Sequence, residues 1–269
     1  MLAVVSTPIG HPKDISLRAL EVLQEAEVVI GEERREASTL LKKLNVPPKD
    51  LYLLNEHSTV ADVRELVELC RHKKVALISD CGTPSFYDPG YQLVRECRRL
   101  NIPVTSIPGA SSLMTLLSLV SEKVTQFYFA GFLPADNELR QQRFKQLMLM
   151  PDALVLMDTP YRLQKLLTEL DAKTPRRHIL LGLNLTQEQE LVIEGTASEL
   201  LQKLSAQKIE KAEFILLLYA NGGVGAHTSP KSITSANTPR RRTDQQGSAR
   251  RDSRHSSSPK KNAPPFRKG

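Results

Sequence analysis

Residues 79–90 read Ser-Asp-Cys-Gly-Thr-Pro-Ser-Phe-Tyr-Asp-Pro-Gly, and this stretch decides the fold. It follows the apolar run Val-Ala-Leu-Ile at 75–78, which predicts a buried strand, and it precedes residues 91–100, which predict a helix. Open α/β sheets bind their ligands where a strand ends and a helix begins. A connection this long and this rich in turn formers is typical of a functional loop. The stretch therefore predicts an α/β protein with a ligand site at this strand end.

Two further loops have the same character. Residues 7–10, Thr-Pro-Ile-Gly, end a predicted strand at 2–6, and residues 108–112, Pro-Gly-Ala-Ser-Ser, end another at 102–107. Each loop alone indicates only a turn or a helix N-cap. If the three strands are neighbours, their loops line one cleft. The sequence has no GxGxxG after its first strand and no GxxxxGK(S/T) anywhere, which argues against dinucleotide and P-loop sites.

Strand and helix patterns alternate through residues 1–221, and this alternation predicts two α/β domains, 1–120 and 121–221, with a hinge near 120–126. Further strands are predicted at 28–30, 127–129, 153–157, 178–183, 190–194 and 213–219, further helices at 32–44, 59–70, 111–121, 137–150 and 196–204, and a loop at 131–134. The order of the strands in their sheets is not readable from these patterns.

Several helix starts are marked by capping residues. Thr59 with Asp62, and Thr196 with Glu199, have the spacing of a capping box. Asp88 followed by Pro89 predicts the N-cap and first position of the helix at 91–100. One more helix is predicted to begin after Asp14 or Ser16, with Leu17, Leu20 and Leu23 on its apolar face.

The charge is unevenly distributed along the 269 residues. The net charge is +7, yet residues 222–269 hold eleven Lys or Arg against two Asp, while residues 1–221 hold 26 Lys or Arg against 28 Asp or Glu. The last segment is rich in Ser, Pro and Arg with few aliphatic residues, which predicts a disordered basic tail. Such a tail either neutralises nucleic-acid phosphates without sequence preference or serves only as a solubilising segment.

Cysteine usage and hydropathy indicate a cytoplasmic protein without membrane contact. Cys70, Cys81 and Cys97 are odd in number and lack CxxC spacing, which disfavours both disulfides and a zinc site, so no metal is expected. Cys70 and Cys97 are expected in the core as small apolar residues. No apolar run approaches the roughly 20 residues of a membrane span. The N-terminus has no basic region or cleavage site of a signal peptide.

The three loops and their neighbours together resemble a known family. Thr-Pro-Ile-Gly at 7–10, Asp-Ile-Ser-Leu-Arg-Ala-Leu at 14–20, the stretch 79–91, Pro-Gly at 108–109 and Gly-Phe-Leu-Pro at 131–134 occur in one order. They resemble the small-subunit ribosomal RNA methyltransferase I family, within the tetrapyrrole methylase superfamily, over about residues 2–221. The resemblance implies a two-domain class III S-adenosylmethionine methyltransferase fold and a homodimer. It also implies 2′-O-methylation of a cytidine in small-subunit ribosomal RNA, with that RNA or the small ribosomal subunit as partner.

The same resemblance implies site residues. The residues that the resemblance assigns to S-adenosylmethionine binding are Pro8, Asp80, Gly82, Thr83, Phe86, Ser111, Ser112 and Met157. Among them, Asp80 is expected to organise its loop. Methyl transfer requires alignment of acceptor, methyl group and donor, and a ribose hydroxyl benefits from a base or a stabilising cation. Glu32, Arg35 and Arg162 are accordingly expected beside the acceptor.

The acceptor side departs most from the family pattern. Residues 32–36 are Glu-Glu-Arg-Arg-Glu where the family has Glu-Asp-Thr-Arg-His, and residues 183–187 are Leu-Asn-Leu-Thr-Gln in place of Arg-Glu-Leu-Thr-Lys. Ala130 stands where the family has Glu. Two alternatives therefore stay open: a methyltransferase of a small, tetrapyrrole-type molecule, and a non-catalytic RNA-binding paralogue that retains the cofactor pocket.

Overall fold

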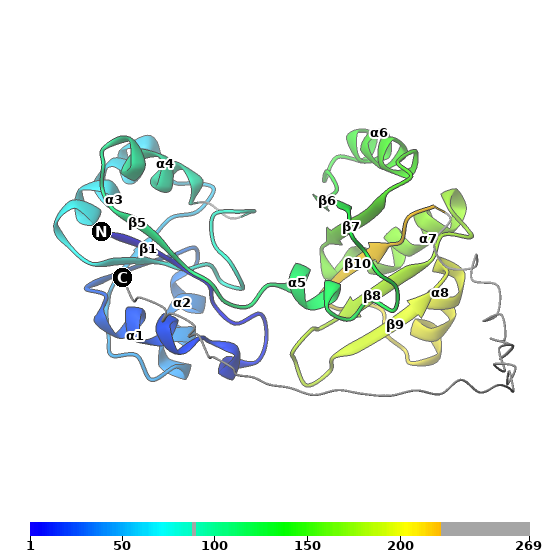
Figure 1. The fold of residues 1–269 in the computed structure, drawn as a ribbon, viewed down its shortest axis with the longest axis horizontal. Coiled ribbons are helices and arrows are strands. Elements are labelled where there is room, and N and C mark those ends of the chain that lie inside the picture. Colours follow the sequence, from blue (N-terminus) through cyan, green and yellow to red (C-terminus); the bar gives the residue numbers. More distant parts are fainter. Residues whose placement is uncertain (88–89, 222–269) are drawn as a thin grey trace, which may run out of the picture. The chain divides into compact units, whose positions relative to one another are not determined.

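The structure, a computed structural model, describes residues 1–87 and 90–221 (Figure 1). It contains two five-stranded sheets, formed by residues 2–107 and 127–218. The predicted mixed α/β class is therefore confirmed. The division into domains at residues 120 and 121 stays a prediction. The predicted tail at 222–269 and the predicted cap at Asp88 and Pro89 lie outside the described residues.

The first sheet is entirely parallel, in the order β3-β2-β4-β1-β5. Its strands are β1 (Leu2–Val5), β2 (Val28–Gly31), β3 (Asp50–Leu53), β4 (Val75–Leu77) and β5 (Val104–Ile107). The connecting helices are η1 (Pro12–Asp14), α1 (Leu17–Glu25), α2 (Arg34–Lys43), α3 (Val60–His72) and α4 (Tyr91–Arg99). Central parallel strands are buried on both faces, which explains the unbroken Val, Ile and Leu runs.

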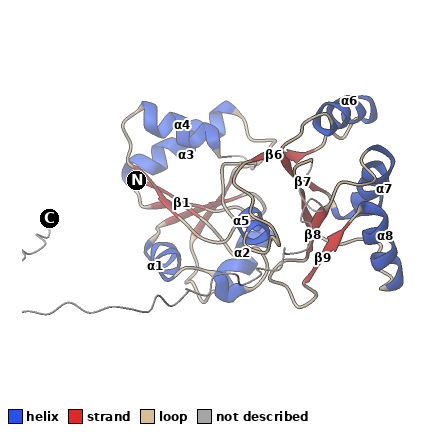
Figure 2. Ribbon diagram, turned by 45° about the vertical axis from the view of Figure 1, so that its right-hand side comes forward, coloured by secondary structure: helices blue, strands red, loops and turns tan. Residues whose placement is uncertain are grey.

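Alternate residues of these strands feed two separate cores. Leu2, Val28 and Ile30 pack with the buried residues of α3 and α4, whereas Ala3 and Val29 pack with those of α1 and α2. Figure 2 shows the two pairs of helices on opposite faces of the sheet. Because successive side chains of a strand point to opposite faces, the sheet needs helices on both sides.

The second sheet is mixed, in the order β6-β7-β10-β8-β9, with only the β6–β7 pair parallel. Its strands are β6 (Phe127–Phe132), β7 (Ala153–Asp158), β8 (Ile179–Leu183), β9 (Leu191–Gly195) and β10 (Phe214–Leu218). The helices are α5 (Ser112–Leu117), α6 (Asn137–Met148), η2 (Pro160–Arg162), α7 (Leu163–Lys173) and α8 (Ala197–Ala206).

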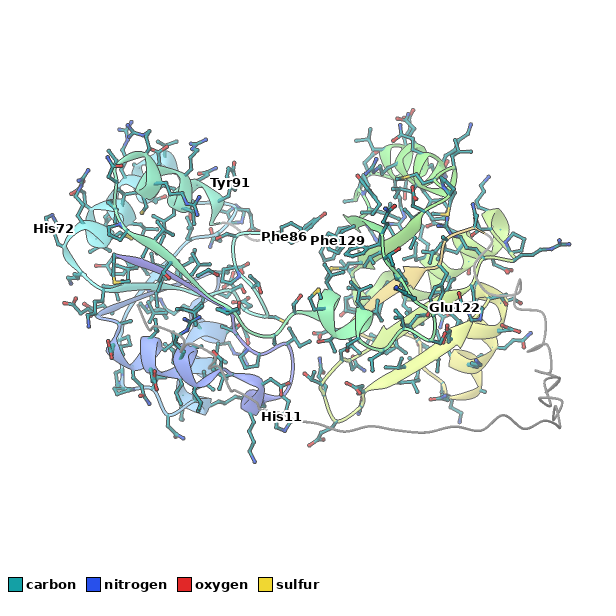
Figure 3. All side chains as sticks on the ribbon, viewed as in Figure 1. His11, His72, Phe86, Tyr91, Glu122 and Phe129 are labelled. Atoms are coloured by element: carbon teal, nitrogen blue, oxygen red, sulfur yellow. The ribbon has the colours of Figure 1, made fainter. Side chains whose placement is uncertain are left out.

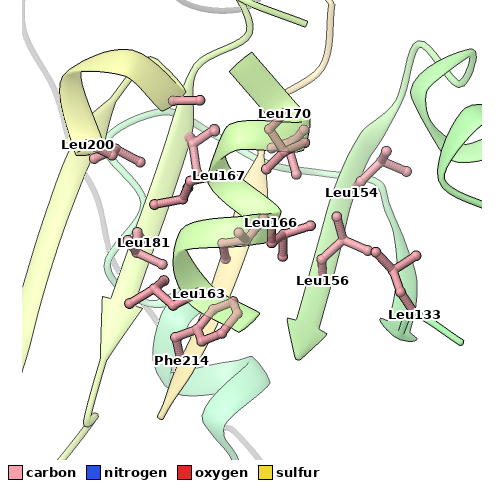
Figure 4. Close-up of a cluster of buried hydrophobic side chains, with 14 of the residues drawn as sticks. Leu133, Leu154, Leu156, Leu163, Leu166, Leu167, Leu170, Leu181, Leu200 and Phe214 are labelled. Atoms are coloured by element: carbon pink, nitrogen blue, oxygen red, sulfur yellow. The ribbon is translucent and has the colours of Figure 1, made fainter. Parts of the chain in front are cut away.

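A leucine-rich core holds this second sheet against its helices. Leu154 and Leu156 of β7 pack with Leu163, Leu166 and other leucines of α7 (Figure 4). The opposite face of the sheet packs against Leu116 of α5. Both faces are thus covered, as in the first sheet.

Most predicted helix starts are confirmed. Ser16 caps α1 by accepting the backbone N–H of Ala19, and both capping boxes form, at Thr59 and at Thr196. The predicted apolar face of α1 is partly wrong. Leu17 is 81% exposed, because it occupies the first helical position, and Ala19 takes its place in the core beside Leu23.

Three elements differ from the sequence-based expectation. Gly131 and Phe132 belong to β6 rather than to a loop, because a bulge between Phe129 and Gly131 lets the strand continue. Neither α7 nor β3 was predicted. The leucines of α7 at 163, 166, 167 and 170 have the helical i, i+3, i+4, i+7 spacing, so that signal was present in the sequence.

Two of the three cysteines lie in the core. Cys70 and Cys97 are buried free thiols, as predicted, whereas Cys81 is exposed. Among residues 1–87 and 90–221, no helix is both long and apolar enough to cross a bilayer. The described residues also contain no group of three or more His, Cys, Asp or Glu side chains placed to hold a metal ion.

The bulge at Gly131 ties the 79–90 loop to the second sheet. Gly131 has φ +64°, and a Cβ there would overlap the Tyr87 hydroxyl. We expect Gly131→Ala to lower the free energy of unfolding by more than the about 1–2 kcal/mol that a left-handed backbone costs a non-glycine residue. Urea denaturation measures this loss.

The control places Gly131→Ala in a Tyr87→Ala background. Removing the ring removes the overlap, so only the backbone cost should remain. Equal losses in both backgrounds would show that Tyr87 does not press on the bulge.

Candidate functional site

Three loops meet at the carboxyl edge of the first sheet, because β4, β1 and β5 are adjacent and parallel. The Thr7 backbone N–H donates to the Gly82 carbonyl over 2.8 Å, and the Thr7 hydroxyl donates to the Ser79 carbonyl. The hydroxyls of Ser6 and Thr83 lie 3.0 Å apart. The Thr83 hydroxyl also donates to the Ala110 carbonyl over 3.5 Å, so the loops at 7–10 and 108–112 meet the described part of the loop at 79–90, as predicted.

Two glycines allow the backbones of these loops to approach. A Cβ at Gly109 would lie 2.9 Å from the Ser6 Cβ, closer than two carbons can pack. Gly82 has φ +81°, a left-handed conformation that costs glycine nothing. The loop edge thus depends on residues that carry no side chain.

A first cavity, the apolar cavity, has a volume of about 300 Å³. It adjoins the loops at Ile9, Cys81 and Ser112, and its other walls come from the second sheet. Those walls are Phe132, Met157, Asp158, Thr159, Pro160, Gly182, Leu185, Glu213, Phe214 and Ile215. Mostly apolar walls with a few polar groups are typical of small-molecule sites.

A second cavity, the polar cavity, is larger, at about 730 Å³. Its charged and titratable lining residues are His11, Glu36, Lys43, Asp80, Glu188 and Glu213. The two cavities share Ile9, Cys81 and Glu213 as lining residues, so they adjoin each other. An apolar and a polar compartment therefore meet at the loop edge.

Thr186 and Gln187 line the polar cavity, and Thr186 does so in a strained conformation. Asn184 and Thr186 have φ values of 45° and 65°, which is rare for a β-branched residue such as threonine. Segment 184–187 is held in place: the Thr186 hydroxyl accepts from the His11 backbone N–H over 3.1 Å, and the Gln187 amide donates to Glu213 over 2.8 Å. Strained residues that the surroundings hold in place cluster at functional sites.

Asp80 joins its loop to the start of α2. Its carboxylate accepts the backbone N–H of Glu33, and its expected role as the organiser of its loop stays a prediction. Burial raises the pKa of Asp80 despite that hydrogen bond, and the neighbouring Glu36 and Glu33 carboxylates raise it further. An aspartate with a raised pKa is a stronger proton acceptor than an ordinary one.

A buried ion-pair cluster supports the wall formed by 157–160. Arg140 of α6 is 1% exposed and donates to Asp158 over 2.6 Å and to Glu169 over 3.1 Å. Asp158 also accepts the Thr159 backbone N–H over 2.8 Å. Burial alone would lower the pKa of Arg140, but its hydrogen bonds to Glu169 and Asp158 and their negative charges raise it above its usual value. The cluster fixes the end of β7, where the apolar cavity begins.

The structure distributes the predicted cofactor residues over this region. Pro8 and Asp80 line the polar cavity, Ser112 and Met157 line the apolar cavity, and the Thr83 hydroxyl donates to the Ala110 carbonyl over 3.5 Å. Phe86 lies apart from them: it is 67% exposed and stacks on Phe129, with ring centroids 5.4 Å apart (Figure 3).

Gly82 and Ser111 belong to the loop edge itself. Gly82 supplies the carbonyl that binds Thr7, and Ser111 occupies the N-cap position of α5, where its hydroxyl makes no capping bond within the described residues. That hydroxyl is therefore not committed to the helix end.

The predicted acceptor residues occupy two places. Glu32 and Arg35 lie at the end of β2 and the start of α2, next to Glu36 of the polar cavity. Arg162 follows β7, donates to the Ala135 carbonyl over 3.4 Å and lies 3.7 Å from Asp158. Glu32 and Arg35 are thus close in sequence to the polar cavity, while Arg162 belongs to the support of the apolar cavity wall.

Sequence reasoning missed much of the second-sheet lining. Gly182, Leu185 and Phe214 line the apolar cavity. Gly182 and Phe214 read only as strand residues, and Leu185 belonged to the segment 183–187, which was compared with the family's acceptor-side pattern. His11 and Lys43 of the polar cavity carried no motif of their own. His11 directly follows the Thr-Pro-Ile-Gly loop, and this adjacency was the one signal available.

Comparison with known proteins identifies the class first. The family described as "Tetrapyrrole (Corrin/Porphyrin) Methylases" matches residues 1–201, and the chain belongs to it. Among solved structures, diphthine synthase superposes with a TM-score of 0.61 at 16% identity, covering 82% of this chain and 90% of that one. Uroporphyrin-III C-methyltransferase from Thermus thermophilus, complexed with S-adenyl homocysteine, gives a TM-score of 0.56 at 19% identity, over 81% and 96%. These likenesses confirm the fold.

Sequence relatives then give the particular family. The chain is 36% identical over 220 residues to ribosomal RNA small subunit methyltransferase I of Coprothermobacter proteolyticus, covering 81% of this chain and 97% of the relative. The protein of that name from Leptospira biflexa is 34% identical over 219 residues, covering 81% and 90%. The chain belongs to the ribosomal RNA small subunit methyltransferase I family, as its motifs predicted, and is a methyltransferase.

The Arg140 cluster predicts a large stability effect. Arg140→Ala removes the 2.6 Å partner of the buried Asp158 and leaves it only Arg162, at 3.7 Å. Breaking a buried pair in this way costs about 3–5 kcal/mol. Chemical denaturation should show that loss in the free energy of unfolding. Gln142→Ala, an exposed change on the same helix, is the matched control and should stay within about 0.5 kcal/mol of the parent. Similar values for both variants would contradict the proposed support.

Proposed function

We propose that this chain transfers the methyl group of S-adenosylmethionine to the 2′-hydroxyl of a cytidine in small-subunit ribosomal RNA. The observation that carries the proposal is the pair of adjoining cavities at the three-loop edge. One cavity is mostly apolar, as a cofactor with an adenine ring requires, and the other is polar and wide enough for a nucleotide. The names of the sequence relatives support the ribosomal RNA.

The apolar cavity fits S-adenosylmethionine on chemical grounds. Ile9, Met157 and Phe214 offer apolar contact to a flat ring, and the Ser112 hydroxyl offers a polar contact at the start of α5. Gly182 lets the side chains of Leu185 and Leu116 pack closely on β8, since a Cβ there would lie 3.0 Å from Leu185 and 3.1 Å from Leu116. The bound cofactor supplies an electrophilic methyl group. The chain's residues would hold it and exclude water around it.

The polar cavity would receive the acceptor nucleotide. A ribose hydroxyl is a weak nucleophile, so the proton must pass to a base and the oxygen must be aligned. Asp80 lines this cavity and has a raised pKa, so its carboxylate is suited to accept that proton. Glu32 and Arg35, next to this cavity in the sequence, remain our candidates beside the acceptor, and Lys43 adds a cation for the RNA phosphate. Arg162, beside Asp158 of the apolar cavity, would act from the cofactor side.

Cofactor binding provides the first test. Isothermal titration with S-adenosylmethionine should give saturable binding, and the absence of binding at millimolar cofactor would refute the proposal. We expect Gly182→Val to weaken the affinity at least about tenfold, because its branched side chain would displace Leu185, which lines the apolar cavity. Thermal denaturation of the same variant checks that the fold persists. Unchanged affinity in a folded variant would place the cofactor elsewhere.

Methyl transfer to RNA is the decisive experiment. Small-subunit ribosomal RNA from cells with and without this protein should differ by one 2′-O-methylcytidine. Transfer of labelled methyl to a tetrapyrrole in place of RNA would favour the small-molecule alternative. Cofactor binding without transfer to either would favour the non-catalytic paralogue.

We further propose that the protein is a homodimer in the cytoplasm. An exposed aromatic surface, composed of Phe86, Tyr87, Phe129 and Phe132, supports an interface between two copies. Phe86 and Tyr87 are 67% and 51% exposed, and clustered exposed apolar side chains mark protein–protein contacts. Sedimentation velocity should give a dimer for the parent and a monomer for Phe86→Ser. A monomeric parent would refute the assembly.

A further inference from the structure

Tyr161 is an exposed aromatic residue that belongs to neither the core nor the exposed aromatic surface. It is 78% exposed on η2 and directly follows Pro160, which lines the apolar cavity. A single exposed aromatic side chain is common and is not informative by itself. The residues around this ring, however, indicate a binding role.

A lysine covers one face of the Tyr161 ring. The Lys211 ammonium lies 5.1 Å from the ring centroid, within the distance of a cation–π interaction. Lys211 lies two residues before Glu213, which lines both cavities. The ring and its cation therefore come from two segments that each continue into the cavity walls.

The two segments are joined and carry net positive charge. The Gln164 side chain donates to the Ile209 carbonyl over 2.9 Å, which holds segment 160–165 against segment 207–213. Together the two segments carry four cationic side chains, those of Arg162, Lys165, Lys208 and Lys211, against two carboxylates, those of Glu210 and Glu213. Residues 1–221 as a whole are net negative, so this basic site stands out.

We propose that Tyr161 and Lys211 form a stacking platform for an unpaired base of single-stranded RNA, next to the nucleotide that enters the polar cavity. This inference deepens the proposed function and rests on it for the identity of the RNA. Aromatic rings stack on bases of any sequence, and neighbouring cations bind the phosphates between them. Lys211 lies over the ring, and the side chain is still 78% exposed, so it is accessible to a base. Unpaired bases are also what RNA-modifying proteins recognise most readily.

Steady-state kinetics on protein-free small-subunit ribosomal RNA test the platform. Tyr161→Ala should raise the KM for RNA by about 5- to 100-fold, the range for loss of one stacked base, with kcat and the cofactor Kd unchanged. Tyr161→Phe keeps the ring and should stay within about twofold of the parent. Tyr161→Leu keeps the bulk without a π face and should resemble Tyr161→Ala. An unchanged KM in Tyr161→Ala would overturn the inference while leaving the proposed function intact.

A binding measurement makes the test independent of methyl transfer. The chain contains no tryptophan, so Tyr161→Trp introduces a single fluorophore at the platform. A cytidine oligoribonucleotide should quench its emission in a salt-dependent, saturable way. Leu149→Trp, at a 77% exposed position after α6, is the matched control and should not respond. Equal responses, or none at either position, would overturn the platform.

The remaining outcomes separate the two proposals. Quenching by RNA without any methyl transfer would support the platform and refute the proposed function. In another outcome, Tyr161→Ala is defective on intact small subunits but not on protein-free RNA. Such a result would show that Tyr161 contacts a ribosomal protein, and it would overturn the RNA platform.

Discussion

The hydrogen bonds that β1 makes on both sides are the constraint on which the site depends. β1 pairs in parallel with β4 and with β5, so three strands end at one edge of the sheet. Their loops then bond to one another through Thr7, Gly82 and Ser79. Side chains at Ser6 and Thr83 meet only because the strands that carry them are neighbours. A sheet of the same strands in another order would separate these loops.

The second sheet supplies the walls that give the edge its chemistry. Leu185 and Phe214 make one compartment apolar, while Thr186, in its strained conformation, lines the polar one. The buried Arg140 stabilises the wall of the apolar cavity by donating a hydrogen bond to Asp158 at the end of β7. Burial of an ion pair contributes little net stability, so its value here is geometric: it holds the end of β7 in one position.

Prediction from the sequence succeeded where the signal was local. Capping pairs such as Thr59 with Asp62 satisfy helix N–H groups within four residues, so their spacing alone identifies them. It failed where distant residues decide. β6 continues through Gly131 because a bulge shifts its register there, and because glycine leaves room for the Tyr87 ring. The lining residue Gly182 read as an ordinary strand residue, since only its neighbours define a cavity.

The sequence by itself determined the α/β class, most helices and strands, the loops at the strand ends and, through its motifs, the family. These follow from periodicity, capping and short-range spacing, which the chain carries locally. Only the tertiary structure decided the strand order, the pairing of an apolar with a polar cavity, the burial of Arg140 and the approach of Lys211 to Tyr161. Each of these joins residues far apart in the chain, and such contacts form only when the sheets and helices pack together.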